Sequence, residues 1–535
     1  MLIGDLVARN ARQPHIARRR AIIFKQREYN WRQLNEAANS LAHALQEMGV
    51  MKGDRVALLL YNSDAIMIAD YGITKIGVVC PMNYMMSKKE MAYILNDSGA
   101  RILIISNNLL FNIDHIKAEC PKLEKIIVYD QDGSGVPSEY INFDDLITNY
   151  SKEEPVPSEP ISDREMAYLM YTGGTTGLPK GVMLSHHNLT INALWSASLS
   201  KHKVDPDEYV TLCALPLFHA AANIGVMQIA LGGITLVIMD GFVISEFLEK
   251  MVKYKVVGFG LVPTMINLLI NSPEIEEYRD YLPSIIGVAY GASAISPAVL
   301  RQTMETFPNA DFYQHFGQTE YSPTITVLEA SDHEKALEPG NEYLLAAAGR
   351  ALIGTDVKIV DLDGNEVPVG EVGEIVARGD GTMIGYWNQP EKTAQTIKDG
   401  WLFTGDMGRV DENGYLYVVD RRKDMIVSGG ENIYTKEVED ALYTHPAVLE
   451  CAVIGIPDDR WGEAVHAIVV LKRGYKKGVN VTEEDLIAHV KEEIARYKAP
   501  KSIKFKRSLP KSAQGKILKK DLRKKHWEGK ERRVA

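Results

Sequence analysis

Cysteine is scarce in this chain, with 4 cysteines among 535 residues. They stand at Cys80, Cys120, Cys213 and Cys451, too far apart for a disulfide framework or for the paired spacing of a metal site. We therefore expect buried thiols in a reducing compartment. The N-terminus lacks the uninterrupted apolar segment of a secretory signal, so a cytoplasmic location is expected.

The chain also lacks a membrane-spanning apolar run and an excess of positive charge. The best candidate for a span, residues 224–239, is broken by Gln228, a Gly-Gly pair and Thr235, which predicts a buried helix followed by a strand. The formal net charge of -10 argues against non-specific nucleic-acid binding. We expect small-molecule partners, no nucleic acid and no transmembrane segment.

The length predicts at least two domains, because one hydrophobic core seldom supports so long a chain. Residues 55–320 alternate short β-branched runs with helical patterns, which predicts α/β layers that are mainly parallel and doubly wound. Residues 357–420 show short strands and tight turns, typical of a β-rich subdomain. After about residue 422 a helix-strand-strand-helix pattern predicts a small α+β domain.

A glycine-rich segment, YTGGTTGLPKG at residues 171–181, follows a predicted strand and precedes helical sequence beginning near Ser185. Its glycines let backbone N–H groups turn toward an anion, while Thr175, Thr176 and Lys180 add hydroxyl donors and a cation. The segment therefore predicts phosphate binding. It is not a Walker A loop, because Leu and Pro separate Gly177 from Lys180.

Further motifs follow in one order, and with the glycine-rich segment they resemble the adenylate-forming enzymes. That family includes acyl-CoA synthetases, aryl-CoA ligases, luciferases and peptide-synthetase adenylation domains. The resemblance covers nearly the whole chain and implies an N-terminal AMP-binding domain, residues 1–421, and a mobile C-terminal domain, residues 422–535. The further motifs are LPLFH at 215–219, QHFGQTE at 314–320, GE at 373–374, FTGD at 403–406, RRKDMIVSGGEN at 421–432 and PKSAQGK at 510–516.

The resemblance implies a site for ATP, Mg²⁺ and coenzyme A. Joining a carboxylate to a triphosphate needs cations that cancel the repulsion between the two anions. Lys516, Glu320 and Lys180 are the implied catalytic residues, and Glu320 is the implied metal ligand. The implied contacts to ATP or AMP are Thr172, Gly173, Gly174, Thr175, Thr176, Gly177, Lys180, Gly291, Ala292, Gln314, His315, Phe316, Thr319, Asp406, Arg421 and Lys516.

Three further sets follow from the resemblance. The acid is expected beside His219, Asn223, His315 and Gly317; the CoA channel beside Ser428, Gly429 and Gly430; and the hinge at Lys423. No aspartate that could pair with a substrate ammonium stands between Phe218 and Leu231, which favours a neutral acyl chain. Acetate-specific relatives carry a tryptophan at the Gly317 position, so an acid larger than acetate is expected.

We therefore interpret the chain as an AMP-forming acyl-CoA synthetase. It would convert a carboxylic acid, ATP and CoA to acyl-CoA, AMP and diphosphate through an acyl-adenylate, with a fatty acid longer than acetate as substrate. An aryl-CoA ligase for acids of the benzoate or cinnamate type stays open as an alternative. So does an adenylate-forming enzyme with an acceptor other than CoA, and the chain could form a homodimer.

Overall fold

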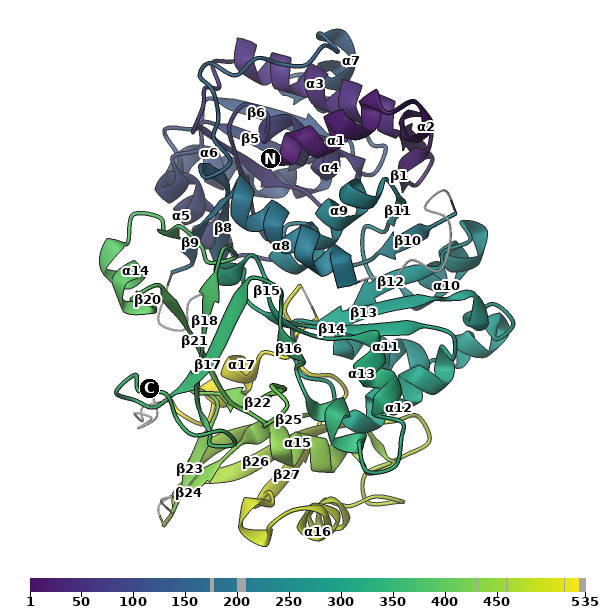
Figure 1. Ribbon diagram of the computed structural model, residues 1–535, viewed down its shortest axis with the longest axis vertical. Coiled ribbons are helices and arrows are strands. Elements are labelled where there is room, and N and C mark those ends of the chain that lie inside the picture. Colours follow the sequence, from purple (N-terminus) through teal and green to yellow (C-terminus); the bar gives the residue numbers. More distant parts are fainter. Residues whose placement is uncertain (174–177, 200–207, 430, 459, 514, 529–535) are drawn as a thin grey trace.

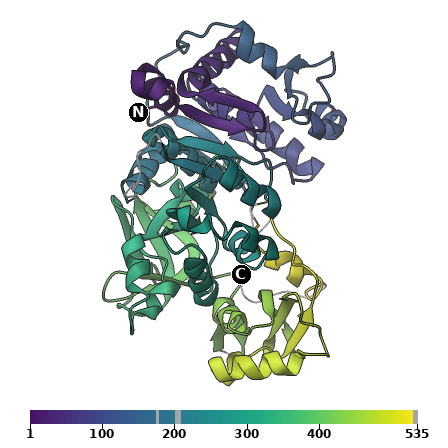
Figure 2. The same ribbon diagram turned by 90° about the vertical axis from the view of Figure 1, so that its right-hand side faces the viewer.

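The structure is a computed structural model that describes residues 1–173, 178–199, 208–429, 431–458, 460–513 and 515–528. These residues form sheets of nine, eight, five and five strands with helices packed around them (Figure 1). The expected α/β class, with a large N-terminal domain, a β-rich subdomain and a small α+β domain, is confirmed. Figures 1 and 2 both show the small domain, in yellow-green, at one end of the long axis.

The eight-stranded sheet has a parallel centre. Strands β3 to β8 pair in parallel in the order β8-β4-β3-β5-β6-β7, and β9 and β19 extend the β8 edge antiparallel. Every residue of β4 and β5 is buried, as expected of strands covered on both faces. Its strands are β3 (Arg55–Leu59), β4 (Val78–Pro81), β5 (Ile102–Ser106), β6 (Lys125–Tyr129), β7 (Ile141–Asn142), β8 (Met166–Thr172), β9 (Lys180–Ser185) and β19 (Gly385–Tyr386).

The nine-stranded sheet is also parallel through its centre and antiparallel at both edges, in the order β16-β15-β14-β13-β12-β10-β11-β1-β2. Its strands are β1 (Arg20–Phe24), β2 (Arg27–Asn30), β10 (Val210–Cys213), β11 (Thr235–Ile238), β12 (Gly258–Leu261), β13 (Gly287–Gly291), β14 (Asp311–Gly317), β15 (Thr324–Leu328) and β16 (Arg350–Ala351). The helix and strand predicted within residues 224–239 are confirmed as part of α9 (Ala220–Gly232) and β11.

Helices fill the space between the two large sheets and cover their outer faces. A shared core joins Ile22 of β1 and Leu58 of β3 through α1 (Ile3–Arg12), α3 (Trp31–Glu47) and α4 (Asp64–Ile73). The remaining helices of this part of the chain are α2 (Pro14–Ala17), α5 (Lys88–Ser98), α6 (Ile113–Glu119), α7 (Phe143–Asn149), α8 (His186–Leu199), α10 (Ile244–Lys253), α11 (Pro263–Ile270), α12 (Pro297–Thr306), α13 (Ala330–Lys335) and α14 (Pro390–Thr396).

Local sequence explains where these helices begin and end. Helix α5 begins after Ser87, whose hydroxyl accepts from the Glu90 backbone N–H while the Glu90 carboxylate reaches back, which is a capping box. It ends at Gly99, whose left-handed φ of 66° suits glycine. Helix α3 begins after Asn30, whose side chain accepts from the Gln33 backbone N–H.

The β-rich sheet precedes the small domain. It contains β17 (Thr355–Val360), β18 (Gly373–Gly379), β20 (Ile397–Lys398), β21 (Trp401–Val410) and β22 (Leu416–Arg421). The small domain contains β23 (Ile426–Ser428), β24 (Glu431–Ile433), α15 (Thr435–Tyr443), β25 (Val448–Asp458), β26 (Gly462–Leu471), α16 (Glu483–Glu493), β27 (Ser502–Phe505) and α17 (Lys519–Lys524). Val438, Val453 and Leu486 belong to a core of its own. The boundary between residues 421 and 422 stays a prediction.

Two expectations about the chain's composition have structural outcomes. All four cysteines are free, and three are buried while Cys213 is half-buried. Within the ranges that the structure describes, no helix combines the length and the apolar character that crossing a membrane requires.

Candidate functional site

Several candidate residues lie where parallel strands of the nine-stranded sheet end. Strands β10, β12, β13 and β14 are neighbours and run in parallel. Their carboxyl ends therefore meet at one edge of the sheet, where open α/β sheets bind ligands. His219 follows β10, Gly291 ends β13, and Glu320 follows β14.

Two glycines are needed there because backbone segments approach closely. A Cβ atom on Gly291 would overlap the carbonyl oxygen of His315, its partner across β13 and β14. A Cβ on Gly317 would overlap the carbonyl oxygen of Pro323. Any side chain at position 317 would therefore begin in a clash with this backbone. A tryptophan could be accommodated there only if the backbone at Pro323 moved. The place of Gly317 in the acid pocket stays a prediction.

Lys180 and Glu320 meet at Tyr386. The ammonium nitrogen of Lys180 lies 4.8 Å from the centre of the Tyr386 ring, and the Tyr386 hydroxyl donates to Glu320 Oε1 at 2.9 Å. Burial lowers the pKa of Lys180, the positive charge of Lys392 lowers it further, and Glu320 opposes the shift. A cation, a carboxylate and a phenol from three different elements thus form one cluster suited to polyphosphate.

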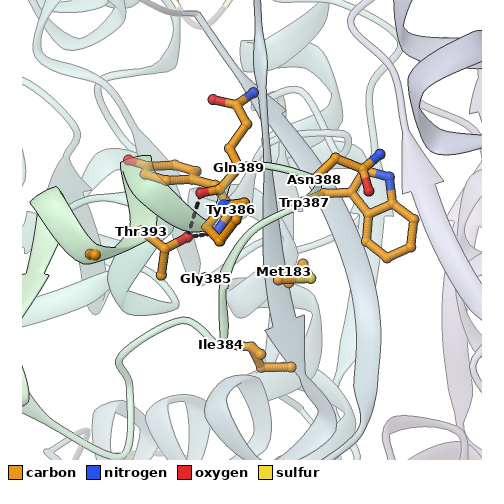
Figure 3. A pocket seen from close by; sticks show the side chains of 10 residues that line it. Met183, Ile384, Gly385, Tyr386, Trp387, Asn388, Gln389 and Thr393 are labelled. Carbon is orange, nitrogen blue, oxygen red and sulfur yellow. Dashed lines mark hydrogen bonds between the residues drawn. The ribbon is translucent and has the colours of Figure 1, made fainter.

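Strand β19 and helix α14 fix the position of Tyr386. Tyr386 pairs with Val182 of β9, and its backbone N–H donates to Thr393 Oγ1 at 2.9 Å. The Thr393 hydroxyl in turn donates to the Gln389 carbonyl at 3.0 Å, as the dashed lines of Figure 3 show. Tyr386 also lines a surface pocket of about 510 Å³, whose other walls include Met183 and Trp387. This pocket therefore adjoins the Lys180–Glu320 cluster.

The Thr-Gly-Asp turn in β21 presents Asp406. The Thr404 hydroxyl donates to the Ile375 carbonyl at 2.7 Å and accepts from the Asp406 N–H at 3.1 Å, while Gly405 takes a left-handed φ of 74°. Asp406 and Arg421 are opposite each other in the pairing of β21 with β22, and Arg421 Nε lies 3.3 Å from Asp406 Oδ1. A largely buried carboxylate oriented this way can accept hydrogen bonds from the hydroxyl groups of a ribose.

Lys516 lies in the same region, although it belongs to the C-terminal part of the chain. Burial lowers the pKa of this half-buried lysine to about 7; Arg421 adds to the shift and Asp406 opposes it. Burial, followed by the charge of Lys516, lowers the pKa of His219 to about 4, so that imidazole is neutral at pH 7. The structure thus brings Lys516, His219, Asp406 and Arg421 together.

The glycine-rich segment connects two antiparallel strands. Thr172 ends β8 and pairs with Lys180 at the start of β9, and Gly173 is exposed. Gly174, Thr175, Thr176 and Gly177 lie outside the described residues. The helix expected near Ser185 begins at His186, but β9 intervenes, which the sequence pattern did not predict.

The remaining nucleotide candidates surround β14. Gln314 and Thr319 are buried, and Phe316 packs against the shared core and against the β-rich sheet. Burial lowers the pKa of His315 to about 4, so its ring is neutral at pH 7. Ala292, directly after β13, has a left-handed φ of 65°. Contact of these residues with a nucleotide stays a prediction.

The two acid-pocket candidates near α9 differ in their surroundings. His219 precedes the helix, and its Nδ1 accepts from the Ala221 N–H at 3.2 Å. Asn223 is only 2% exposed, and its amide nitrogen lies 3.1 Å from Tyr168 Oη and 3.4 Å from Asp70 Oδ2. Burial raises the pKa of Asp70 well above its usual range. The Asn223 amide is thus engaged in the interior, and its contact with an acid stays a prediction.

The CoA candidates have contacts within the small domain. Ser428 ends β23 and pairs with Gly462, while the Gly429 N–H donates to the Trp461 carbonyl at 2.8 Å. Gly430 lies outside the described residues. Burial, followed by the charge of Arg421, lowers the pKa of Lys423. The hinge and channel roles stay predictions.

Sequence reasoning missed Tyr386 and Lys392. Tyr386 is 66 residues from Glu320 along the chain, and it stands in an uncharged Gly-Tyr-Trp segment that carries no motif. Lys392 occupies α14, where a lone lysine is ordinarily a solvated charge. Only the packing of β19 and α14 against β9 brings both residues to Lys180.

The chain matches two family models and several characterised proteins. Residues 7–387 match the family model of AMP-binding enzymes, and residues 437–516 match that of the AMP-binding enzyme C-terminal domain. The chain is 33% identical over 517 residues to the fatty acid–[acyl-carrier-protein] ligase ScoC of Streptomyces coeruleorubidus, covering 96% of this chain and 95% of that one.

Two further relatives extend the comparison. The long-chain-fatty-acid–CoA ligase FadD13 of Mycobacterium tuberculosis is 34% identical over 497 residues, or 92% of each chain. The crystal structure of the anthranilate CoA ligase AuaEII in complex with anthranoyl-AMP superposes with a TM-score of 0.89 at 29% identity, covering 99% of this chain and 98% of that one. The three proteins are named for different acids, and ScoC is named for a carrier protein where the other two are named for CoA.

Proposed function

Because the chain belongs to the AMP-binding enzyme family and is a ligase of that family, we propose that it joins a fatty acid to coenzyme A through an acyl-adenylate. The overall reaction converts the acid, ATP and CoA to acyl-CoA, AMP and diphosphate. The observation that carries the proposal is the convergence of Lys516, from the small domain, with Asp406 and His219 of the large domain.

In the first half-reaction a carboxylate oxygen attacks the α-phosphorus of ATP, and diphosphate leaves with the electrons of the broken P–O bond. Both reactants are anions, so the charge of Lys516 offsets their repulsion and helps to align them. Asp406 accepts hydrogen bonds from the ribose hydroxyls, and Lys180 contacts the phosphates. Phe316 is the surface against which the adenine packs.

Mg²⁺ fits the proposed phosphate site as an ion held mainly by the nucleotide. In the part of the chain that the structure describes, no group of three or more acidic, histidine or cysteine side chains could hold a metal ion alone. Mg²⁺ ordinarily uses one or two carboxylates together with substrate phosphates. Glu320, oriented by the Tyr386 hydroxyl, supplies such a carboxylate beside Lys180. The ion would neutralise charge on the phosphates.

In the second half-reaction the CoA sulfur attacks the acyl carbonyl carbon. The bond to the phosphate oxygen breaks, AMP leaves with that oxygen, and the thiol proton passes to solvent. We propose that the small domain, residues 422–535, rotates at Lys423 against residues 1–421 between the two steps. The rotation would withdraw Lys516 and bring Ser428, Gly429 and Gly430 beside the pantetheine arm.

The acid is proposed to be a neutral fatty acid longer than acetate. Support comes from the absence of an aspartate between Phe218 and Leu231 in the sequence, from the neutral His219 ring and from the likeness to a long-chain-fatty-acid–CoA ligase. A carrier protein is the second candidate acceptor, because ScoC, named for acyl-carrier-protein as acceptor, is 33% identical over 96% of this chain. A cytoplasmic location and a homodimer stay predictions.

An acid panel with two acceptors tests the proposal. AMP release would be measured for acids from acetate to palmitate and for benzoate and cinnamate, each with CoA or with a phosphopantetheinylated carrier protein. We expect the highest kcat/KM with a fatty acid longer than acetate and with CoA. Faster turnover of the aromatic acids would transfer the proposal to an aryl-CoA ligase, and turnover with the carrier protein alone would exclude CoA as the acceptor.

A further inference from the structure

Helix α11 of the large domain holds the small domain through two side chains. The hydroxyl of Thr264 donates to the carbonyl oxygen of Gly515 at 2.8 Å. One turn further along, the amide nitrogen of Asn267 donates to the carbonyl oxygen of Leu449. The acceptors come from two separate segments of the small domain, the loop before α17 and the start of β25.

The orientation of the Asn267 amide is fixed by Asn271, the residue that directly follows helix α11. The Asn271 side-chain nitrogen donates to Asn267 Oδ1 at 2.9 Å and to the Asn267 carbonyl at 2.8 Å. Because Oδ1 of Asn267 accepts from Asn271, its NH₂ group is the end that faces Leu449. Asn267 is 5% exposed, so this donor needs a partner inside the interface.

Gly515 approaches α11 closely enough to exclude a side chain. A Cβ atom on Gly515 would lie 2.9 Å from Thr264 Oγ1 and 3.1 Å from a methyl group of Val262, and the residue has a left-handed φ of 79°. Lys516 is the next residue. The contact that holds Gly515 against α11 therefore also determines where the Lys516 side chain begins.

We propose that Thr264 and Asn267 are positioning residues that select the domain orientation in which Lys516 reaches the adenylation site. This inference rests on the proposed function. It adds the residues that stabilise one of the two proposed orientations of the small domain. Both bonds join the two domains, so a rotation that withdraws Lys516 must break them. On the α11 side, both hydrogen bonds run from a side chain to a backbone carbonyl of the small domain.

Removing the Thr264 hydroxyl is the sharpest test. A hydrogen bond of this kind shifts an equilibrium by about threefold to tenfold. Thr264→Val, which keeps the branched shape, should lower ATP–diphosphate exchange by about threefold to tenfold and leave thioester formation from supplied acyl-AMP unchanged or faster. Thr264→Ser, the matched control, keeps the hydroxyl and should retain wild-type exchange. Equal losses in both half-reactions, or full exchange by Thr264→Val, would overturn the proposal.

A second measurement needs no substrate. Amide hydrogen exchange of the peptide containing Gly515 and Lys516 should be faster in Thr264→Val and in Asn267→Leu than in the wild type and Thr264→Ser, at equal melting temperature. Unchanged exchange in both variants would overturn the proposal. If the wild type activates no acid of the panel, the proposed function fails, whereas the hydrogen-exchange comparison still decides whether α11 holds the Lys516 loop.

Discussion

The charge of Lys516 predicts a pH dependence that only the first half-reaction shows. Burial beside Arg421 lowers the pKa of Lys516 from 10.5 to about 7. About half of these side chains are then charged at pH 7 and about a tenth at pH 8 in the free enzyme. Because the charged form offsets the repulsion between carboxylate and triphosphate, kcat/KM for adenylation should fall about tenfold per pH unit above 7.

The assay compares two half-reactions and one variant across pH. ATP–diphosphate exchange is measured from about pH 6 to about pH 9, and thioester formation from supplied acyl-AMP is measured over the same range. The exchange reaction of Lys516→Arg should lose the decline above pH 7, since a guanidinium stays charged throughout. A wild-type exchange profile that stays flat to pH 9, or the same decline in thioester formation, would refute the role given to this lysine.

Three further substitutions test other parts of the site. Tyr386→Phe removes the hydrogen bond from the hydroxyl to Glu320 but keeps the ring beside Lys180. ATP–diphosphate exchange should therefore fall about tenfold to hundredfold with little change in Tm. Unchanged exchange would contradict the role given to the cluster of Lys180, Glu320 and Tyr386. Asp406→Asn should raise the KM for ATP and reduce the preference for ATP over 2′-deoxy-ATP, whereas an intact preference would place the ribose elsewhere. Gly317→Ala should lower the free energy of unfolding by about 1–3 kcal/mol in a denaturation series, because the added Cβ overlaps the Pro323 carbonyl. Wild-type stability of this variant would show that the backbone at Pro323 moves to accommodate the methyl group.

Much of the fold follows from local pattern, because local pattern determines helices and buried parallel strands. The helix-strand-strand-helix pattern expected after about residue 422 is present in the structure as α15, β25, β26 and α16. The parallel layers followed from alternating β-branched and helical segments. The family was predicted from motifs, and the comparisons confirm it.

The remaining features depend on contacts between distant segments. Residues 180–185 form the antiparallel strand β9, because Thr172 and Lys180 pair across the glycine-rich segment, and this pairing is not visible in a window of sequence. Tyr386 joins Lys180 to Glu320 only after β19 pairs with β9. Tertiary packing also places the Asn223 amide nitrogen beside the Tyr168 hydroxyl, a contact that its sequence position after His219 does not reveal.

The central claim is that a carboxylate oxygen of the acid attacks the α-phosphorus of ATP. It is tested most directly with an acid from the panel carrying ¹⁸O in its carboxylate, using mass spectrometry of the nucleotide and diphosphate products. The account predicts that the AMP released on thioester formation contains ¹⁸O from the acid, and that diphosphate contains none. Unlabelled AMP, or label in diphosphate, would contradict an acyl-adenylate intermediate.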